Sequence, residues 1–443
     1  MKVVVVGANH AGTAAINTIL NEYPENQVTV FDQNSNISFL GCGMALWIGK
    51  QISSAQGLFY SSAEAMEEKG ATVHMNTEVT EIDYENRVVH AKGADGTEYA
   101  EPYDKLILAT GSRPIWPNLP GMDLENVQAV KQFQHAQEVI DKLEGDKIQQ
   151  VTVVGAGYIG VELAEAFVRN GRKTRLVDCA DTCLSGYYDS DFCQRMADHM
   201  AAHGVEMCFG EKVLELQGEN GAVKKVVTSK GTYDTDMVVF AIGFVPNSAL
   251  GGEHLQLQRG AYLVDRTQKT SDPNVYAVGD CATIYNNAKE RTDYIALATN
   301  AVRSGILAAH NACGTVLESP GVQGSNGISI WGLNMFSTGL TKQKAEAEGM
   351  DVLTTECTDW QKAAFMEHGN TKTTVRIVYR KDTRAIVGAQ LVSDYDVSMG
   401  IHLFSLAIQQ KLTIDQLKLL DLFFLPHFNQ PYNYITMAAL NAE

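Results

Sequence analysis

The stretches Lys2-Val-Val-Val-Val-Gly7-Ala-Asn-His-Ala-Gly12 and Gln150-Val-Thr-Val-Val-Gly155-Ala-Gly-Tyr-Ile-Gly160 share one design. In each, an apolar run leads into closely spaced glycines, and a segment of helical character follows. A second apolar run then ends in an acidic residue, Asp32 in the first copy and Asp178 in the second. This order of strand, glycine turn, helix and strand is typical of a βαβ unit that binds a dinucleotide. The sequence therefore predicts two such units in one chain.

Each glycine of such a unit has its own physical reason. The first allows a tight turn, the second lets the backbone approach a pyrophosphate, and the third lets the helix pack on the strand. Amide groups at the helix N-terminus then hold the phosphate charge. The second copy has all three glycines, whereas the first has Asn9 in the middle place. Asparagine tolerates left-handed backbone better than most residues, so the first unit is still expected to form.

The rest of the chain completes an α/β pattern. Strand-and-turn segments are expected at Leu106–Pro114, Val238–Pro246 and Asn274–Ala282. The helices of the two units are expected at Thr13–Leu20 and up to about Arg169, and the second strands at Gln27–Phe31 and Lys173–Val177. From about Gly324, β runs (Thr373–Tyr379, Ala385–Val392) precede amphipathic helices (Val397–Gln409, Ile414–Leu420). We predict two Rossmann-like dinucleotide-binding domains, the first discontinuous (1–112 with 247–320) and the second at 113–246, and a C-terminal α+β domain at 321–443.

Composition narrows the class of protein. The 443 residues are enough for two to four domains that each bury a core. A net charge of −17 argues against nucleic acid or an anionic membrane as a partner. No signal peptide and no apolar run of roughly 20 residues is present, so we expect a cytoplasmic protein. Eight scattered cysteines fit a reducing compartment, and the Cys179/Cys183 pair lacks the second ligand pair of a usual zinc site.

Cys42 is the cysteine with the most informative position. It lies in Ile37-Ser-Phe-Leu-Gly-Cys-Gly-Met-Ala-Leu-Trp47, ten positions beyond Asp32, with no second cysteine at CxxC or CxxxxC spacing. A lone cysteine in a large enzyme is often only a small buried hydrophobe. Beside a redox cofactor, however, a thiol without a disulfide partner must react alone.

These features together resemble the flavoprotein disulfide reductase superfamily, the pyridine nucleotide-disulfide oxidoreductases, over essentially the whole chain. The segment Ser38–Trp47, with His10 in the first fingerprint, is similar to the NADH oxidase and NADH peroxidase branch, and Met-Ala-Leu-Trp is most similar to water-forming NADH oxidases. The resemblance implies FAD and NADH as cofactors, O2 as a substrate and a homodimer formed through the C-terminal domain. The aromatic stretch Phe423–Tyr434 is then expected to form part of the dimer interface, because in relatives it approaches the flavin of the partner subunit.

The resemblance also implies a set of cofactor contacts. Those expected at FAD are Gly7, Asn9, Ala11, Gly12, Asp32, Thr110, Gly111, Ser112, Asp280, Leu297, Ala298 and Thr299. Those expected at NADH are Gly155, Gly157, Tyr158, Ile159, Gly160, Asp178, Tyr187 and Gly243. An aspartate at position 178 repels a 2′-phosphate and favours NADH, although Arg172, Lys173 and Arg175 lie nearby in the sequence.

Electron counting indicates a reaction for Cys42, the reduction of hydrogen peroxide. Reduction of O2 to two waters takes four electrons and NADH delivers two, so hydrogen peroxide has to be reduced before it escapes. A thiolate does this by becoming sulfenic acid, the reversible first step of cysteine oxidation. His10 is the expected proton donor, and a charged His10 is expected to favour the thiolate. The alternatives are an NADH peroxidase, a coenzyme A disulfide reductase that uses Tyr432 or Tyr434, and a redox-sensing binding protein.

Overall fold

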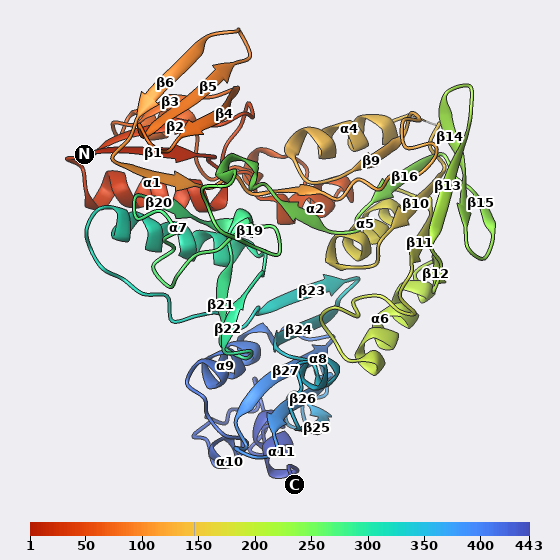
Figure 1. The fold of residues 1–443 in the computed structure, drawn as a ribbon. Coiled ribbons are helices and arrows are strands. Elements are labelled where there is room, and N and C mark those ends of the chain that lie inside the picture. Colours follow the sequence, from red (N-terminus) through yellow and green to blue (C-terminus); the bar gives the residue numbers. More distant parts are fainter. Residues whose placement is uncertain (146) are drawn as a thin grey trace.

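A parallel five-stranded sheet carries the first fingerprint (Figure 1). The computed structural model describes residues 1–145 and 147–443. The strand order of this sheet is β20-β7-β1-β2-β3, with bounds Val275–Ala277, Lys105–Leu108, Lys2–Val6, Gln27–Phe31 and Thr72–His74. Because β20 follows the second unit in the sequence, the chain returns to this sheet after leaving it. Two segments that are separated in the sequence therefore contribute strands to one sheet.

The alternation of side chains along β1 explains how this sheet is covered. Val3 and Val5 are buried against helices α1 (His10–Glu22) and α7 (Ala298–Ala312). Val4 and Val6 point to the other face, as successive strand residues do. There they pack towards a small antiparallel sheet made of β4 (Thr77–Asp83), β5 (Val88–Gly93) and β6 (Glu98–Pro102). The four-valine run is therefore buried on both faces, as in other parallel sheets.

The second fingerprint lies in a sheet of the same type. Its strand order is β12-β11-β10-β16-β9, with bounds Val205–Phe209, Lys173–Asp178, Gln150–Val154, Met237–Phe240 and Val127–Ala129. Its helices are α4 (Phe133–Leu143), α5 (Tyr158–Arg169) and α6 (Ser190–Ala202), and a three-stranded sheet is added by β13 (Val213–Glu219), β14 (Ala222–Thr228) and β15 (Thr232–Asp234). The crossover segments pair as β8 (Ser112–Pro114) and β17 (Phe244–Pro246). The two units are thus joined by antiparallel strands.

The C-terminal part is an antiparallel sheet with helices, drawn in blue at the bottom of Figure 1. Its strand order is β23-β24-β27-β26-β25, with bounds Asn326–Ile330, Leu333–Gly339, Ile386–Ser393, Lys372–Arg380 and Val352–Trp360. Its helices are α8 (Lys342–Ala347), α9 (Ser398–Gln409), α10 (Ile414–Leu417) and α11 (Tyr434–Leu440). Strand β23 packs against α5 of the second unit, because Ile328 and Ile330 share one hydrophobic cluster with Val161.

The predicted fold class is confirmed, with local differences. Helix α1 begins at His10 rather than Thr13, because the carbonyl of Asn9 already accepts the Thr13 amide at 2.8 Å. Helix α10 ends at Leu417, earlier than the expected Leu420. Within residues 1–145 and 147–443, no helix is long and apolar enough to cross a membrane. The domain boundaries stay a prediction.

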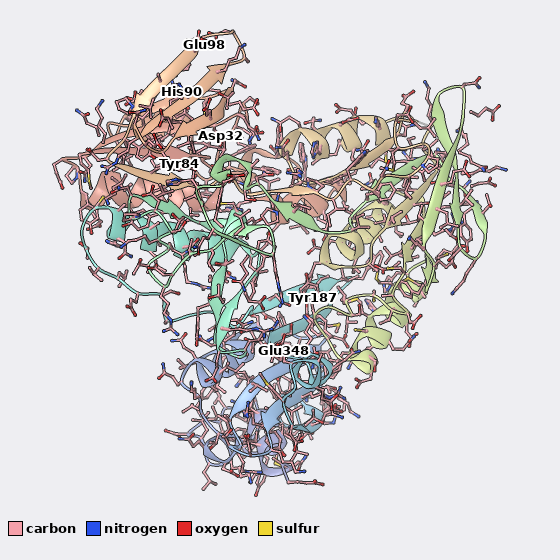
Figure 2. All side chains as sticks on the ribbon, viewed as in Figure 1. Asp32, Tyr84, His90, Glu98, Tyr187 and Glu348 are labelled. Carbon is pink, nitrogen blue, oxygen red and sulfur yellow. The ribbon has the colours of Figure 1, made fainter. Side chains whose placement is uncertain are left out.

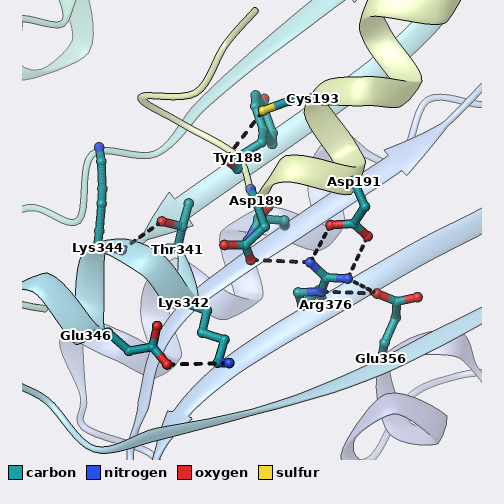
Figure 3. Close-up of polar contacts among 11 residues, drawn as sticks. Tyr188, Asp189, Asp191, Cys193, Thr341, Lys342, Lys344, Glu346, Glu356 and Arg376 are labelled. Atoms are coloured by element: carbon teal, nitrogen blue, oxygen red, sulfur yellow. Dashed lines mark hydrogen bonds and ion pairs between the residues drawn. The ribbon is translucent and has the colours of Figure 1, made fainter. Parts of the chain in front are cut away.

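Ion pairs around Arg376 connect the second unit to the C-terminal sheet (Figure 3). Arg376 of β26 donates to both carboxylate oxygens of Asp191 at 2.7 Å, and to Glu356 of β25 at 2.6 and 3.0 Å. Asp189 lies 3.4 Å away and also accepts from Gln390 of β27 at 2.7 Å. Burial alone would raise the pKa of Asp191, but the hydrogen bonds from Arg376 outweigh it and lower that pKa. The cluster joins α6 to three strands of the other sheet.

Arg376→Gln is expected to destabilise the protein by about 2 kcal/mol, because it leaves three carboxylates facing one another. The folded-state pKa of Asp191 lies below its unfolded value, so its stabilisation is present at neutral pH and is lost as the pH falls through the folded pKa. Thermal unfolding of both proteins at neutral and acid pH checks this. Arg380→Gln is the control, since the ion pair of Arg380 within the described residues is a local one, with Asp382 two residues away. A loss no larger than in that control would contradict the prediction.

Candidate active site

A cleft of about 820 Å³ lies where the strands of the first sheet end. This is the edge at which open α/β sheets bind ligands, and the volume is within the usual range for ligand sites. Most of the residues expected at FAD line it together with His10: Gly7, Asn9, Ala11, Asp32, Thr110, Gly111, Ser112 and Asp280. Gly12 packs behind the cleft on Gly7, and α7 contributes Ala301 to the lining while Leu297, Ala298 and Thr299 form its start.

The turn at Gly7 has the geometry that a nucleotide cradle needs. Gly7 has a φ of +96°, and a Cβ at this position would meet the carbonyl oxygen of Ala109 at 2.3 Å. Asp32 is buried and accepts from the amides of Ala8 at 2.7 Å and Asn34 at 2.8 Å. Burial raises the pKa of Asp32, and these hydrogen bonds act in the opposite direction. The acid at the end of β2 is therefore fixed beside the glycine turn, as the fingerprint requires.

A second polar group sits deeper in the same cleft. Ser112 donates to Asp280 at 2.8 Å, and Lys131 lies 3.5 Å from the same carboxylate and also donates to Ser112. Burial lowers the pKa of Lys131, while Asp280 acts to raise it. Sequence reasoning missed Lys131, because it follows a short strand with no recognisable motif. It adds a second basic side chain, beside Arg113, to a cleft whose acids include Asp32 and Asp280.

The second unit repeats the glycine geometry. Gly155 has a φ of +105°, and its Cβ would lie 2.4 Å from the oxygen of Ala241. A Cβ on Gly157 would meet nothing within 4 Å, so this turn has an open face for a ligand. Asp178 accepts from Ala156 at 2.6 Å and from Ala180 at 2.8 Å. Gly160 packs on Gly155, Ile159 is half-buried beside it, and Gly243 follows β16 with a φ of +105°.

Tyr158 connects the second unit to the C-terminal sheet. Its hydroxyl lies 2.7 Å from that of Tyr188 and donates to Asn326 at the start of β23. The ring of Tyr187 packs edge-on against Tyr158, with centroids 4.4 Å apart, and Figure 2 shows Tyr187 close to the C-terminal sheet. Figure 2 places Asp32 in the first unit, in another part of the molecule. Sequence reasoning had no signal for Asn326, whose contact depends on the packing of two parts of the chain.

Cys42 lies in a one-turn 3-10 helix, Gly41–Gly43, directly before α2 (Met44–Ile48). It lines a cavity of about 470 Å³ between α2, α5, β23 and α9, together with Glu162, Asn326 and His402. Cys42 is an exposed residue, but the cavity walls desolvate its thiol; this desolvation raises the pKa of Cys42, and the charge of Glu162 raises it further. Burial also raises the pKa of Glu162 to about 7, with the charge of Glu165 adding to the effect. All eight cysteines are free thiols.

His10 begins α1 and faces the first cleft. Its Nδ1 lies 2.9 Å from the hydroxyl of Tyr60, and the two rings are parallel. Burial lowers the pKa of His10, although the charge of Asp280 acts to raise it. This corrects the expectation that a charged His10 keeps Cys42 ionised, because burial favours the neutral form of both groups.

Glu162→Gln is expected to lower the pKa of Cys42 and to speed its alkylation by iodoacetamide about threefold near pH 8. As the pH rises through about 7, Glu162 ionises, and its charge opposes ionisation of the neighbouring thiol. Without that charge the thiolate forms at lower pH. Mass spectrometry of the Cys42 peptide measures the rate, and Glu138→Gln on the exposed side of α4 is the control. Equal rates in the wild type and Glu162→Gln would show that this charge does not act on Cys42.

The C-terminal segment presents an aromatic surface. Phe423, Phe424, Phe428 and Tyr432 are all exposed, at 69%, 45%, 52% and 72%. Gln361 donates to the carbonyl of Phe428 at 3.0 Å, so the hairpin after β25 holds the segment in place. Large apolar patches on a protein surface usually mark interaction sites. The exposure of these four residues does not fit ordinary core within one chain, whereas Tyr434 at the end of the predicted stretch is buried in the core of the C-terminal part.

Comparison with known proteins agrees with this geometry. A profile of the pyridine nucleotide-disulphide oxidoreductase family matches residues 1–305, and the profile of its dimerisation domain matches residues 330–433. The chain therefore belongs to the pyridine nucleotide-disulphide oxidoreductase family. It is 58% identical over 455 residues to an NADH oxidase of Streptococcus pyogenes, covering 100% of this chain and 99% of that relative. It is 52% identical over 446 residues to an NADH oxidase of Lactococcus lactis, with 100% of both covered.

A solved structure gives the same result. The water-forming NADH oxidase from Lactobacillus brevis, bound to NADH, matches with a TM-score of 0.96 at 37% identity. The match covers 99% of this chain and 97% of that one. The predictions of family, of an oxidoreductase, and of FAD and NADH as its cofactors are confirmed at the level of the family.

Proposed function

We propose that the protein is a water-forming NADH oxidase, with the reaction 2 NADH + 2 H⁺ + O2 → 2 NAD⁺ + 2 H2O. The observation that carries the proposal is the position of Cys42: a solitary thiol in a cavity that it shares with α5, the helix of the second nucleotide unit. The similarity to NADH oxidases, one of them water-forming, supports the same reaction.

The cleft of the first unit fits FAD. The glycine turn that a Cβ would fill, the fixed Asp32 and the Ser112–Asp280–Lys131 group are what a dinucleotide with a polar chain needs. When bound, FAD supplies two-electron transfer from NADH to oxygen and to oxidised sulfur. NADH is assigned to the second unit, where Gly157 leaves the turn open and Asp178 disfavours a 2′-phosphate.

Cys42 removes the peroxide that a two-electron reduction of O2 leaves. The thiolate attacks one peroxide oxygen, the O–O bond breaks, and the leaving hydroxide takes a proton to become water. In sum, Cys–SH + H2O2 gives Cys–SOH + H2O. The sulfenic acid then takes two electrons and two protons, supplied as the hydride of NADH and one H⁺, giving Cys–SH, NAD⁺ and a second water. His10 is the proposed hydrogen-bond donor towards peroxide, and its lowered pKa favours the neutral form for this role; it lines the cleft of the first unit, whereas Cys42 lines the cavity beside α5.

An NADH peroxidase is the nearest alternative, because it would use the same residues. Two assays separate the activities: aerobic NADH oxidation without added peroxide, and anaerobic oxidation with it. The proposal expects turnover in the first assay at a rate at least equal to that in the second. Turnover only in the second would make the protein a peroxidase.

A coenzyme A disulfide reductase is the more distant alternative. Its expected tyrosines differ in exposure, since Tyr434 is buried in α11 and Tyr432 is exposed. Mass spectrometry of the resting enzyme decides the question, because such an enzyme would carry coenzyme A on Cys42. The proposed oxidase carries none.

We also propose a homodimer formed through the aromatic surface Phe423–Tyr432, in agreement with the dimerisation-domain match. A sedimentation mass of a single chain would contradict it. A cytoplasmic location is proposed with it, since the reaction uses the NADH of that compartment.

A further inference from the structure

Ser38 ties together three segments that reach the candidate site. Its amide donates to the carbonyl of Ala8 in the first fingerprint at 3.1 Å, and its hydroxyl donates to the carbonyl of Ser61 at 2.7 Å. The same hydroxyl accepts from the amides of Tyr60 at 3.1 Å and Ser61 at 2.8 Å. Ser38 itself stands four residues before Cys42. The backbone amide and the hydroxyl of this one buried residue thereby connect the segments that carry His10, Cys42 and Tyr60.

The backbone of Ser38 is strained at this junction. Ser38 is fully buried and has a φ of +59°, a left-handed conformation that residues other than glycine rarely adopt. Such backbone persists only where the surroundings enforce it, and it is concentrated at functional sites. Two further contacts hold the Tyr60 segment: Leu40 donates to Leu58 at 2.7 Å, and Phe39 pairs with Phe59.

Tyr60 uses this fixed position to contact His10. The phenol oxygen lies 2.9 Å from Nδ1 of His10, and the rings are parallel within 2° at a centroid distance of 5.8 Å. Tyr60 is 47% exposed, whereas His10 is half-buried at the rim of the cleft. Burial raises the pKa of Tyr60, so the phenol keeps its proton. A neutral imidazole carries one proton, and the partner of one nitrogen decides which nitrogen holds it.

We propose that Tyr60 is a positioning residue for His10: its hydroxyl donates to Nδ1 and so places the imidazole proton on Nε2. Because Tyr60 is exposed, its hydroxyl also provides a route for protons between His10 and solvent. This inference rests on the proposed function.

The arrangement gives a balanced proton path for peroxide reduction. When the Cys42 thiolate attacks and the O–O bond breaks, the Nε2 proton passes to the leaving hydroxide and forms water. The phenol proton passes to Nδ1, and the phenolate takes a proton from solvent. When Cys42 next ionises, its proton passes to Nε2 of His10. The proton on Nδ1 then returns to the phenol oxygen of Tyr60, which releases one proton to solvent, so that the imidazole is again protonated on Nε2. One proton enters and one leaves in each cycle, as Cys–SH + H2O2 → Cys–SOH + H2O requires.

Tyr60→Phe tests the proposal, because it removes the hydroxyl and keeps the ring. The measurement is the rate at which hydrogen peroxide converts Cys42 of the FAD-containing enzyme to sulfenic acid without NADH, trapped with dimedone and read by mass spectrometry. We expect a rate about tenfold lower at neutral pH, the effect of one lost hydrogen bond. Peroxide release during NADH oxidation is expected to rise in parallel.

Two comparisons separate positioning from packing. Tyr99→Phe makes the same change at a tyrosine that packs on His74, and it should leave the rate unchanged. In a His10→Asn background, Tyr60→Phe should have no further effect, because its partner is gone. An unchanged rate in Tyr60→Phe, or an equal loss with and without His10, would overturn the inference. If the wild type forms no sulfenic acid at Cys42, the proposed function itself fails, and the two failures are thereby distinguished.

Discussion

Replacing Cys42 with serine is expected to leave NADH oxidation largely intact and to change its product from water to hydrogen peroxide. A serine hydroxyl does not reduce peroxide, whereas a thiolate does. The cleft that fits FAD and the second unit that fits NADH do not include Cys42, so oxygen is still reduced by two electrons. The ratio of NADH consumed to O2 consumed should fall from two to one, and peroxide should accumulate in equal amount to the O2 used.

The matched control is Cys313→Ser. Cys313 follows α7, is only partly buried, and lies near Asn26, away from both cavities. This variant should keep a ratio of two and release no more peroxide than the wild type. If Cys42→Ser also kept a ratio of two, the thiol would have no part in peroxide reduction.

Gly7→Ala is expected to yield a protein that does not hold FAD. A Cβ at Gly7 would lie 2.3 Å from the oxygen of Ala109 and 2.9 Å from its carbon, and both are backbone atoms of the adjacent strand segment. The turn between β1 and α1 would have to open, and this turn forms the floor of the cleft. A loss of several kcal/mol in stability is expected, because a backbone clash adds to the strain of positive φ.

Gly70→Ala separates these two effects. Gly70 has a φ of +102°, close to the +96° of Gly7, but a Cβ there meets nothing within 4 Å. It should cost only about 1 kcal/mol and keep a full FAD content. Flavin absorbance per chain and thermal unfolding measure both quantities. Equal FAD content in the two variants would contradict the role given to the turn at Gly7.

The fold could be predicted largely because its determinants are local. Two glycine turns between apolar strands, each followed by an acid, define two parallel sheets regardless of what surrounds them. The three-stranded sheets β4–β6 and β13–β15 were not predicted, since register shifts interrupt the alternation of polar and apolar residues in β4 and β13. The start of α1 at His10 was also missed, although asparagine is a favoured N-cap residue; Asn9 takes this position without a capping hydrogen bond from its side chain.

The candidate site could be predicted only in part. Gly7, Asp32 and Asp280 converge on one cleft as the resemblance implies. Lys131 and Tyr60 have no motif and reach the site through packing, which a single sequence does not record. The electrostatics also depended on burial: the sequence suggested a charged His10, whereas its surroundings in the fold favour the neutral form.

We propose that Cys42 completes the reduction of oxygen to water inside the enzyme. The most direct measurement is the number of NADH molecules oxidised per O2 consumed by the purified wild-type protein, with NADH in excess. We expect a ratio of two with no peroxide released. A ratio of one, with peroxide equal to the O2 consumed, would contradict it.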